Sequence, residues 1–180
     1  MPERRVVKWG NPLLTRGAEP VTQFGTEQLQ LLVTDLWDTM SARGGTGLAA
    51  PQIGERYRIV VFEIKPSPRY PELDPVPPTV LINPEVQPVS DNMAKGWEGC
   101  LSLPGMRGLV PRYACIEISA HDIHGQPIKQ QVHGYHARVV QHECDHLDGI
   151  LYPQRIQDMN MFGFEEELSL AGKLNQVSPC

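Results

Sequence analysis

Proline is the residue that most limits the folds open to this chain. The sequence holds 17 prolines in 180 residues, and eight of them fall between residues 66 and 88. Proline locks φ and has no N–H group, so this density disfavours both a helix and a central strand. We therefore expect residues 66–88 to form a proline-rich inserted loop around one short strand, at Thr79–Asn83.

Composition otherwise indicates an ordinary globular protein, with 41 % hydrophobic and 21 % charged residues. A chain of this length is predicted to form a single domain, residues 1–180, with a sizeable core. The net charge of −5 disfavours DNA binding. No apolar run approaches the ~18 residues of a membrane helix. No apolar stretch follows the charged residues near the start, so we expect a cytoplasmic location.

Hydrophobic periodicity and turn residues predict an α+β fold. Leucines and other apolar residues recur at three- and four-residue steps over 26–43, which indicates an amphipathic helix that Thr26 caps. Further helices are predicted at 134–147 and 158–170, and further strands at 59–64, 115–120 and 128–133. Hairpins between helices favour a mostly antiparallel sheet. Residues 153–180 are interpreted as a variable C-terminal tail.

The strongest chemical signal is the run His142-Glu143-Cys144-Asp145-His146. Residues four apart lie on one face of a helix, so both imidazoles can reach one metal ion. Glu143 follows the first histidine and is placed to act on water as a general base. The alternative is a solvated helix that happens to carry two histidines.

A catalytic metal site needs a third protein ligand and one open position. No histidine follows His146, and the glutamates at 165–167 lie beyond Pro153. Upstream, Cys100 stands between Gly99 and an apolar residue, and its thiolate is a good soft ligand. A free cysteine is more commonly a small buried hydrophobe, but beside the histidine motif we favour the ligand. The wide spacing of the four cysteines fits no zinc ribbon, and disulfides are not expected in a cytosolic chain of this length.

In three motifs the sequence resembles the peptide deformylase family, of the bacterial type. The motifs read Gly45-Thr46-Gly47-Leu48-Ala49-Ala50-Pro51-Gln52, Glu98-Gly99-Cys100-Leu101-Ser102 and Gln141-His142-Glu143-Cys144-Asp145-His146, in the family's order. Thr46 is polar where the family usually has a hydrophobic residue. The resemblance runs from about Val6, where the sequence looks like the family's opening strand, to about Tyr152.

The resemblance implies a fold and an activity. The fold is a compact α+β domain with mostly antiparallel β-sheets around a central helix that carries the HExxH motif. The activity is that of a metal-dependent hydrolase that removes the N-formyl group from the N-terminal methionine of newly synthesised proteins and releases formate. Cys100, His142 and His146 would hold one divalent metal ion per chain, natively Fe²⁺, with Zn²⁺, Ni²⁺ or Co²⁺ able to substitute.

The resemblance also implies roles in the chemistry. Metal-bound water would attack the formyl carbonyl, with Glu143 as general acid/base. The Gln52 side chain and the Leu101 backbone N–H would stabilise the oxyanion. Without the other motifs, Gln52 would be interpreted as a turn residue exposed to water.

Four residues are predicted to bind substrate. Gly45 and Gly47 lack side chains, so their backbone could accept an extended peptide as an extra strand. The simpler interpretation is a helix end and a turn. Gly99 and Arg107 are expected to line the substrate groove, and the loop at 66–88 is expected to form part of its rim.

Other residues are expected to support the site. Glu98 and Asp145 are candidates for carboxylates that hold the ligands, with Arg112 as their partner. The alternative is a set of simple surface pairs. Cys144 lies within the histidine motif but points away from its ligand face, so we expect it to fill the core.

The expected substrates are N-formyl-methionyl nascent polypeptides. Such chains emerge at the ribosome, so transient contact with it is expected, although no basic tail is evident to mediate it. Two other functions remain open. A zinc endopeptidase shares HExxH but would need a different third ligand. A peptide-binding module without activity is disfavoured because every residue of the site is intact.

Overall fold

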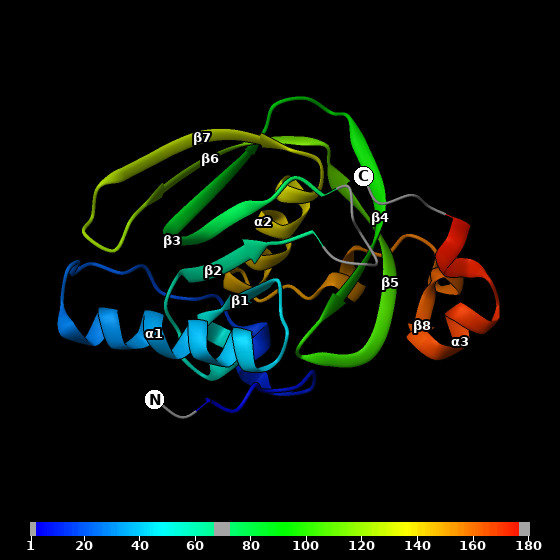
Figure 1. The fold of residues 1–180 in the computed structure, drawn as a ribbon, viewed down its shortest axis with the longest axis horizontal. Coiled ribbons are helices and arrows are strands. Elements are labelled where there is room, and N and C mark those ends of the chain that lie inside the picture. Colours follow the sequence, from blue (N-terminus) through cyan, green and yellow to red (C-terminus); the bar gives the residue numbers. More distant parts are fainter. Residues whose placement is uncertain (1–2, 67–72, 177–180) are drawn as a thin grey trace.

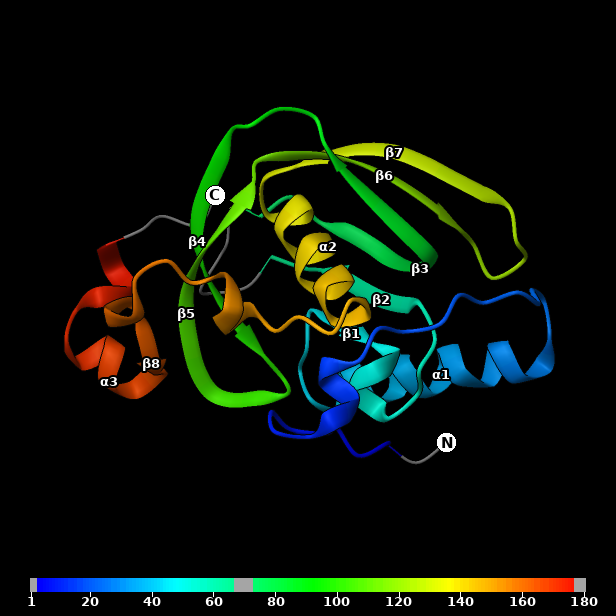
Figure 2. The ribbon, with the colours of Figure 1, turned by 180° about the vertical axis from the view of Figure 1, so that it is seen from behind.

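In the computed structural model, two antiparallel sheets enclose a central helix (Figures 1 and 2). The structure describes residues 3–66 and 73–176. The first sheet has the order β1-β2-β3-β6-β7, with bounds Gly47–Ala49, Ile59–Ile64, Val76–Pro88, Cys115–His121 and Pro127–His133. The second has the order β4-β5-β8, with bounds Met93–Cys100, Leu103–Tyr113 and Phe162–Phe164. The helices are α1 (Glu27–Ala42), α2 (Gly134–Leu147) and α3 (Glu165–Leu170).

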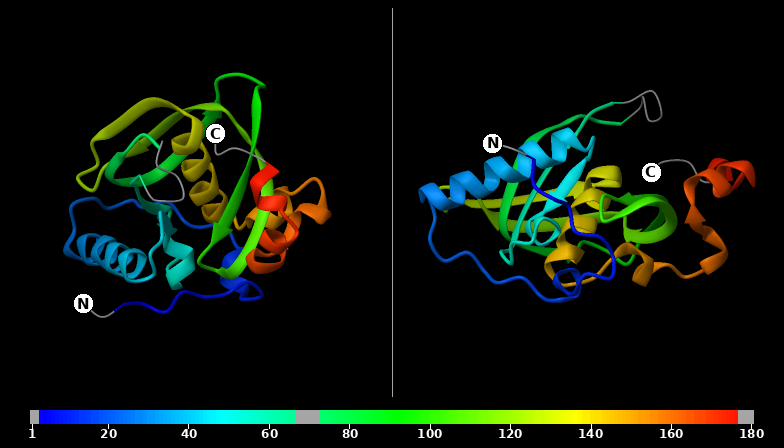
Figure 3. Two further views of the ribbon diagram at one scale, coloured as in Figure 1. Left: turned by 45° about the vertical axis from the view of Figure 1, so that its right-hand side comes forward. Right: turned by 90° about the horizontal axis from the view of Figure 1, so that it is seen from below.

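Strand β2 shows why the first sheet carries a helix on each face. Its residues are all apolar except Glu63, and successive side chains point to opposite faces. Val60 and Phe62 pack with α2, whereas Ile59 and Val61 pack with α1. Two cores therefore share one sheet, and α2 also contacts β5 of the second sheet. Figure 3 shows α1 and α3 at opposite ends of the molecule.

Most of the predicted elements are confirmed. Thr26 caps α1, its side chain accepting a hydrogen bond from the Leu29 N–H, and α2 has the bounds expected from the sequence. The strands predicted at 59–64, 115–120 and 128–133 are β2, β6 and β7. The fold class, α+β with antiparallel sheets around the helix that carries His142 and His146, is also confirmed.

The prediction of a loop with one short strand over the proline-rich segment is wrong. Residues 67–72 lie outside the described residues, but β3 covers Val76–Pro88 and is the middle strand of its sheet, not a short strand in a loop. Its prolines avoid the ladder positions that need an N–H group. Pro77 and Pro78 stand at its exposed start, Pro84 lies within a register shift, and Pro88 ends it. Prolines at such positions are compatible with a strand.

Both ends of the chain also differ from expectation. The residues from Val6 onward form no ladder strand, although the Val7 N–H donates to the Gln52 carbonyl. The segment predicted as one helix near 158–170 divides into a 3₁₀ turn (Met159–Met161), strand β8 and α3. Phe162 packs into a core cluster with Tyr152, and this burial favours pairing of β8 with β5 over a continuous helix. In the described part of the chain, no helix is long and apolar enough to cross a membrane.

Candidate active site

Two elements bring three metal-ligating side chains together. Helix α2 presents His142 and His146 one turn apart, and β4 ends at Cys100. The Cys100 Sγ lies 3.3 Å from the His146 Nε2, and one ligand atom from each of the three residues lies within 4.8 Å of the others. A thiolate and two imidazoles within this span fit one divalent transition-metal ion.

Glu98 orients the first histidine. Its Oε2 lies 2.8 Å from the His142 Nδ1, which leaves the Nε2 to face Cys100. A carboxylate on the distal ring nitrogen is how metal-binding histidines are usually held in one tautomer and orientation. Glu98 was predicted as a carboxylate that holds a ligand, and this contact with His142 agrees with that prediction.

Arg112 links this support to α2 through buried ion pairs. Its guanidinium donates from Nε and Nη2 to the two Glu98 oxygens, each at 2.9 Å, and from Nη1 to Asp145 Oδ2 at 2.5 Å. All three side chains are nearly fully buried, so they are not surface pairs. Although burial opposes ionisation, Arg112 and His142 lower the pKa of Glu98 far below its usual range. Glu98 is therefore a permanent anion.

A second arginine, which the sequence analysis did not predict, binds the same carboxylate. Arg138, one turn before His142 on α2, donates from Nη1 to Glu98 Oε1 at 2.9 Å and to the Val110 carbonyl at 2.8 Å. Its Nη2 donates to the Ala94 carbonyl at 2.7 Å. The i, i+4 spacing to His142 was the available signal.

Glu143 is a buried carboxylate that lacks a full set of hydrogen-bond partners. Its Oε2 has no hydrogen-bond partner among the residues that the structure describes, and the side chain lines the cavity beside the ligands. Burial raises the pKa of Glu143 to about 7, with the two histidines partly opposing the shift. A carboxyl group with a pKa near the working pH can both take and return a proton.

Gln52 is buried, so its interpretation as an exposed turn residue is wrong. It lies in the 3₁₀ helix Ala50–Ile53 that follows β1, and its Oε1 accepts from the Ala49 N–H. Its Nε2 lies 3.3 Å from the Cys100 Sγ and 3.2 Å from the Ser102 Oγ. An amide donor is thus held beside the ligand set.

Leu101 follows Cys100, and a hydrogen bond to its backbone carbonyl holds it in place. Its carbonyl accepts a hydrogen bond from the Lys8 Nζ at 2.8 Å. Its side chain fills the space over Gly45, where a Cβ would lie 2.9 Å from the Leu101 Cδ1. Lys8, Gly45 and Leu101 all line the cavity.

The motif glycines make room for particular side chains. A Cβ on Gly47 would lie 2.3 Å from the Glu143 Oε1, and one on Gly99 would lie 2.3 Å from the Arg107 Nη1. Real Cβ contacts are essentially never this short. Close approach of another group is one reason for glycine at a fixed position.

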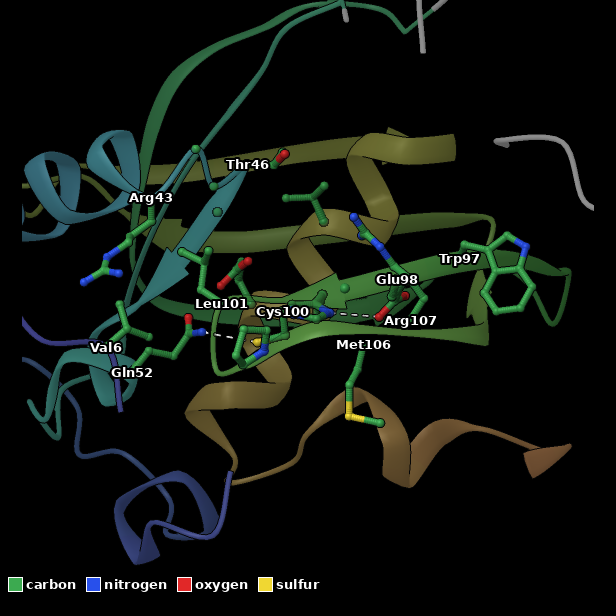
Figure 4. Close-up of a pocket in the computed structure, with 18 of the residues that line it drawn as sticks. Val6, Arg43, Thr46, Gln52, Trp97, Glu98, Cys100, Leu101, Met106 and Arg107 are labelled. Atoms are coloured by element: carbon green, nitrogen blue, oxygen red, sulfur yellow. Dashed lines mark hydrogen bonds and ion pairs between the residues drawn. The ribbon is translucent and has the colours of Figure 1, made fainter. Parts of the chain in front are cut away.

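A cavity of about 520 Å³ opens beside these residues (Figure 4). All four residues predicted to bind substrate line it: Gly45, Gly47, Gly99 and Arg107. Lining residues that sequence reasoning missed include Trp97, Met106, Tyr135, Arg138, Val139 and Glu165. None of the described residues of the 66–88 segment lines it, which counts against that segment as a rim.

The cysteines differ in their surroundings. Burial favours a neutral thiol at Cys100, but His146 and His142 lower its pKa well below the usual value, as suits a ligand thiolate. Burial raises the pKa of Cys144 to about 12, and its side chain packs in the core as expected. Cys100, Cys115 and Cys144 are free, and Cys180 lies outside the described residues.

A Cys-His-His group that could hold a metal ion, beside a buried carboxylate at the wall of an open cavity, fits the class of metal-dependent hydrolases. Comparison with known proteins narrows this class. The sequence profile of the polypeptide deformylase family matches residues 3–161. The chain therefore belongs to the polypeptide deformylase family.

Individual relatives agree with this assignment. Peptide deformylase 2 of Ralstonia nicotianae is 53 % identical over 92 % of this chain and 93 % of its own length. Peptide deformylase 1 of Nitrosomonas europaea is 54 % identical over 91 % of this chain and 93 % of its own length. The Met-Ala-Ser-bound crystal structure of a class I type b peptide deformylase from Acinetobacter baumannii has a TM-score of 0.83 and 36 % identity, covering 86 % of this chain and 99 % of the other.

Proposed function

We propose that this chain hydrolyses the N-formyl group of the initiator methionine on new polypeptides and releases formate during protein biosynthesis. The observation that carries the proposal is the position of Glu143, a buried carboxylate whose Oε2 has no hydrogen-bond partner among the described residues and which lines the same cavity as Cys100 and His142. The Met-Ala-Ser bound to the Acinetobacter relative is the tripeptide such a reaction would leave, which supports the same substrate class.

The proposed metal ligands are Cys100, His142 and His146, whose donor atoms fit one divalent ion. We propose Fe²⁺ as the native ion, with Zn²⁺, Ni²⁺ or Co²⁺ as substitutes. When bound, such an ion lowers the pKa of water and polarises a carbonyl oxygen. Glu98 and Arg112 keep His142 in the orientation that this needs.

Glu143 is the proposed general acid/base. With a pKa raised to about 7, it takes a proton from the attacking water and returns it to the leaving amine. Gly47 allows the carboxylate to lie against β1, so the base is fixed before substrate arrives.

Gln52 and Leu101 are the proposed oxyanion donors. Attack on the formyl carbon places negative charge on its oxygen. The Gln52 Nε2 is positioned by the bond from the Ala49 N–H to the Gln52 Oε1. The Leu101 N–H follows Cys100 directly in the chain. The Lys8 Nζ donates a hydrogen bond to the Leu101 carbonyl and so helps to hold this backbone in place. Donors fixed in advance stabilise such charge, typically by ~3–4 kcal/mol each.

The peptide is proposed to bind along β1. This strand stands at the edge of its sheet, and no other strand of the described residues pairs with its outer side, where a peptide could add as a further strand. Gly45, Gly47, Gly99 and Arg107 line the adjoining cavity and are the proposed binding residues. Substrates that emerge from the ribosome imply a cytoplasmic site of action and transient ribosome contact, which we include in the proposal.

Incubation with formyl-Met-Ala-Ser tests the proposal. We expect equimolar formate and Met-Ala-Ser, with the peptide bonds intact, and no reaction of Met-Ala-Ser itself. Elemental analysis should find one metal ion per chain. Cleavage within the peptide would favour an endopeptidase instead. Binding without any reaction would favour a peptide-binding module.

A further inference from the structure

The segment after Pro153 contributes a side chain to the cavity. Strand β8 lies beside β5 (Figure 2). The register of this pair sets Gly163 opposite Arg107. Glu165 follows two residues later and lines the cavity together with Arg107. The match to the family profile ends at residue 161, so Glu165 lies beyond the matched part of the chain.

Packing fixes this segment on β5. Gly108 lies so close to it that a Cβ would be 2.5 Å from the Ile156 Cδ1 and 2.9 Å from the Tyr152 Cε2. Phe162 packs edge-on against the Tyr152 ring, with centroids 6.1 Å apart. The position of Glu165 therefore follows from buried contacts and strand pairing rather than from a loose surface tail.

Glu165 directs the Arg107 guanidinium. The Arg107 Nε donates to the Glu165 Oε2 at 3.0 Å, while the Nη1 lies where a Cβ of Gly99 would be. Gly99 directly precedes Cys100. Among the residues that the structure describes, Arg107 makes no other hydrogen bond, so its two terminal amino groups are available to a ligand in the cavity.

We propose that Glu165, acting through Arg107, determines which charges the enzyme accepts on the residues that follow the formylmethionine; this rests on the proposed function. In this proposal the formyl group lies at Cys100 and His142, and the second or third substrate residue lies beside the pair, which lines the same cavity. Arg107 attracts an acidic side chain there, and Glu165 attracts a basic one. The pair is about one-third exposed, at 30 % and 35 %, so its own attraction is weak and an incoming charge competes with it.

The test compares charged substrates. The probes are the C-terminal amides of formyl-Met-Ala-Glu and formyl-Met-Ala-Lys, and of formyl-Met-Glu-Ser and formyl-Met-Lys-Ser. The readout is the ratio of kcat/KM for the acidic to the basic peptide at each position. E165Q removes the negative charge and keeps the shape. At one or both positions we expect it to raise this ratio roughly three- to fivefold at low ionic strength, through KM rather than kcat. The change should shrink in high salt because exposed charges are screened.

Two further variants make the result specific. R107Q should shift the ratio in the opposite direction, which keeps the test decisive if E165Q folds poorly. E166Q is the matched control, because Glu166 is the adjacent exposed carboxylate and does not line the cavity. It should leave the ratio as in the wild type.

Each outcome bears on the inference. An unchanged ratio in both E165Q and R107Q would overturn it and leave the proposed function standing. Equal shifts in E165Q and E166Q would also overturn it, because they would reflect only the overall charge. If the wild type releases no formate even from formyl-Met-Ala-Ser, the proposed function fails and this inference fails with it.

Discussion

Replacing Gly47 by alanine tests the placement of the base without touching a reacting group. The added Cβ would lie 2.3 Å from the Glu143 Oε1, 2.7 Å from its Cδ and 2.9 Å from its Cγ. Because three consecutive side-chain atoms are too close, rotation of the carboxylate alone cannot relieve the contact. The whole end of the side chain has to move.

The size of the effect follows from that movement. Ordinary contact begins at 3.4 Å, so the carboxylate oxygen must shift by about 1 Å. A misplacement of ~1 Å in a catalytic group costs on the order of 100-fold in rate. We expect G47A to lower kcat by about this factor.

The assay is formate release from formyl-Met-Ala-Ser, with metal content and thermal unfolding measured on the same preparation. Two glycines are matched controls. At Gly45 the nearest atom is the flexible end of Leu101, at 2.9 Å, so G45A should cost less than about tenfold. At Gly17 no atom lies within 4 Å of the Cβ, so G17A should behave as the wild type. Activity of G47A within threefold of the wild type, at equal metal content, would refute the reasoning.

Three other variants probe separate parts of the site. E143Q keeps the shape of the base and should retain metal while losing about 10²–10⁴-fold in turnover, and a nearly active variant would exclude Glu143 as the base. C100S should lower the metal content found by elemental analysis after dialysis against a chelator, because a hydroxyl replaces the thiolate; wild-type retention would argue against the ligand. R112M removes the buried cation shared by Glu98 and Asp145, which keep Arg138 and Arg155 respectively, and should cost about 3 kcal/mol in urea unfolding. The exposed Arg56 ion pair is the control, and R56M should cost no more than ~1 kcal/mol.

Local patterns in the sequence predicted much of the fold. Helix α2 and strand β2 follow from short-range periodicity, and both have the bounds expected from it. The prediction for β3 is wrong because the proline content of a segment does not specify whether the segment can form a strand. Whether a proline disrupts a sheet depends on which positions need a ladder N–H group, and that depends on the partner strands.

The candidate site could also be predicted from the sequence only in part. Two histidines four apart on a helix share a face whatever surrounds them, so that part of the ligand set could be predicted. The contacts of Glu98 with Arg112 and Arg138 join β4, β5 and α2, and no local pattern specifies them all. No local pattern predicts the contact of Glu165 with Arg107, because it depends on the pairing of β8 with β5.

The sequence by itself determined which chemical groups are present and which of them share a helix face, because backbone geometry sets that spacing. Only the tertiary structure decided their properties. Burial between the two sheets raises the pKa of Glu143 to about 7, and the approach of β4 to α2 brings Cys100 to the histidines. Desolvation and contacts between distant residues arise only when the sheets pack around α2, so they depend on the whole fold rather than on any one segment.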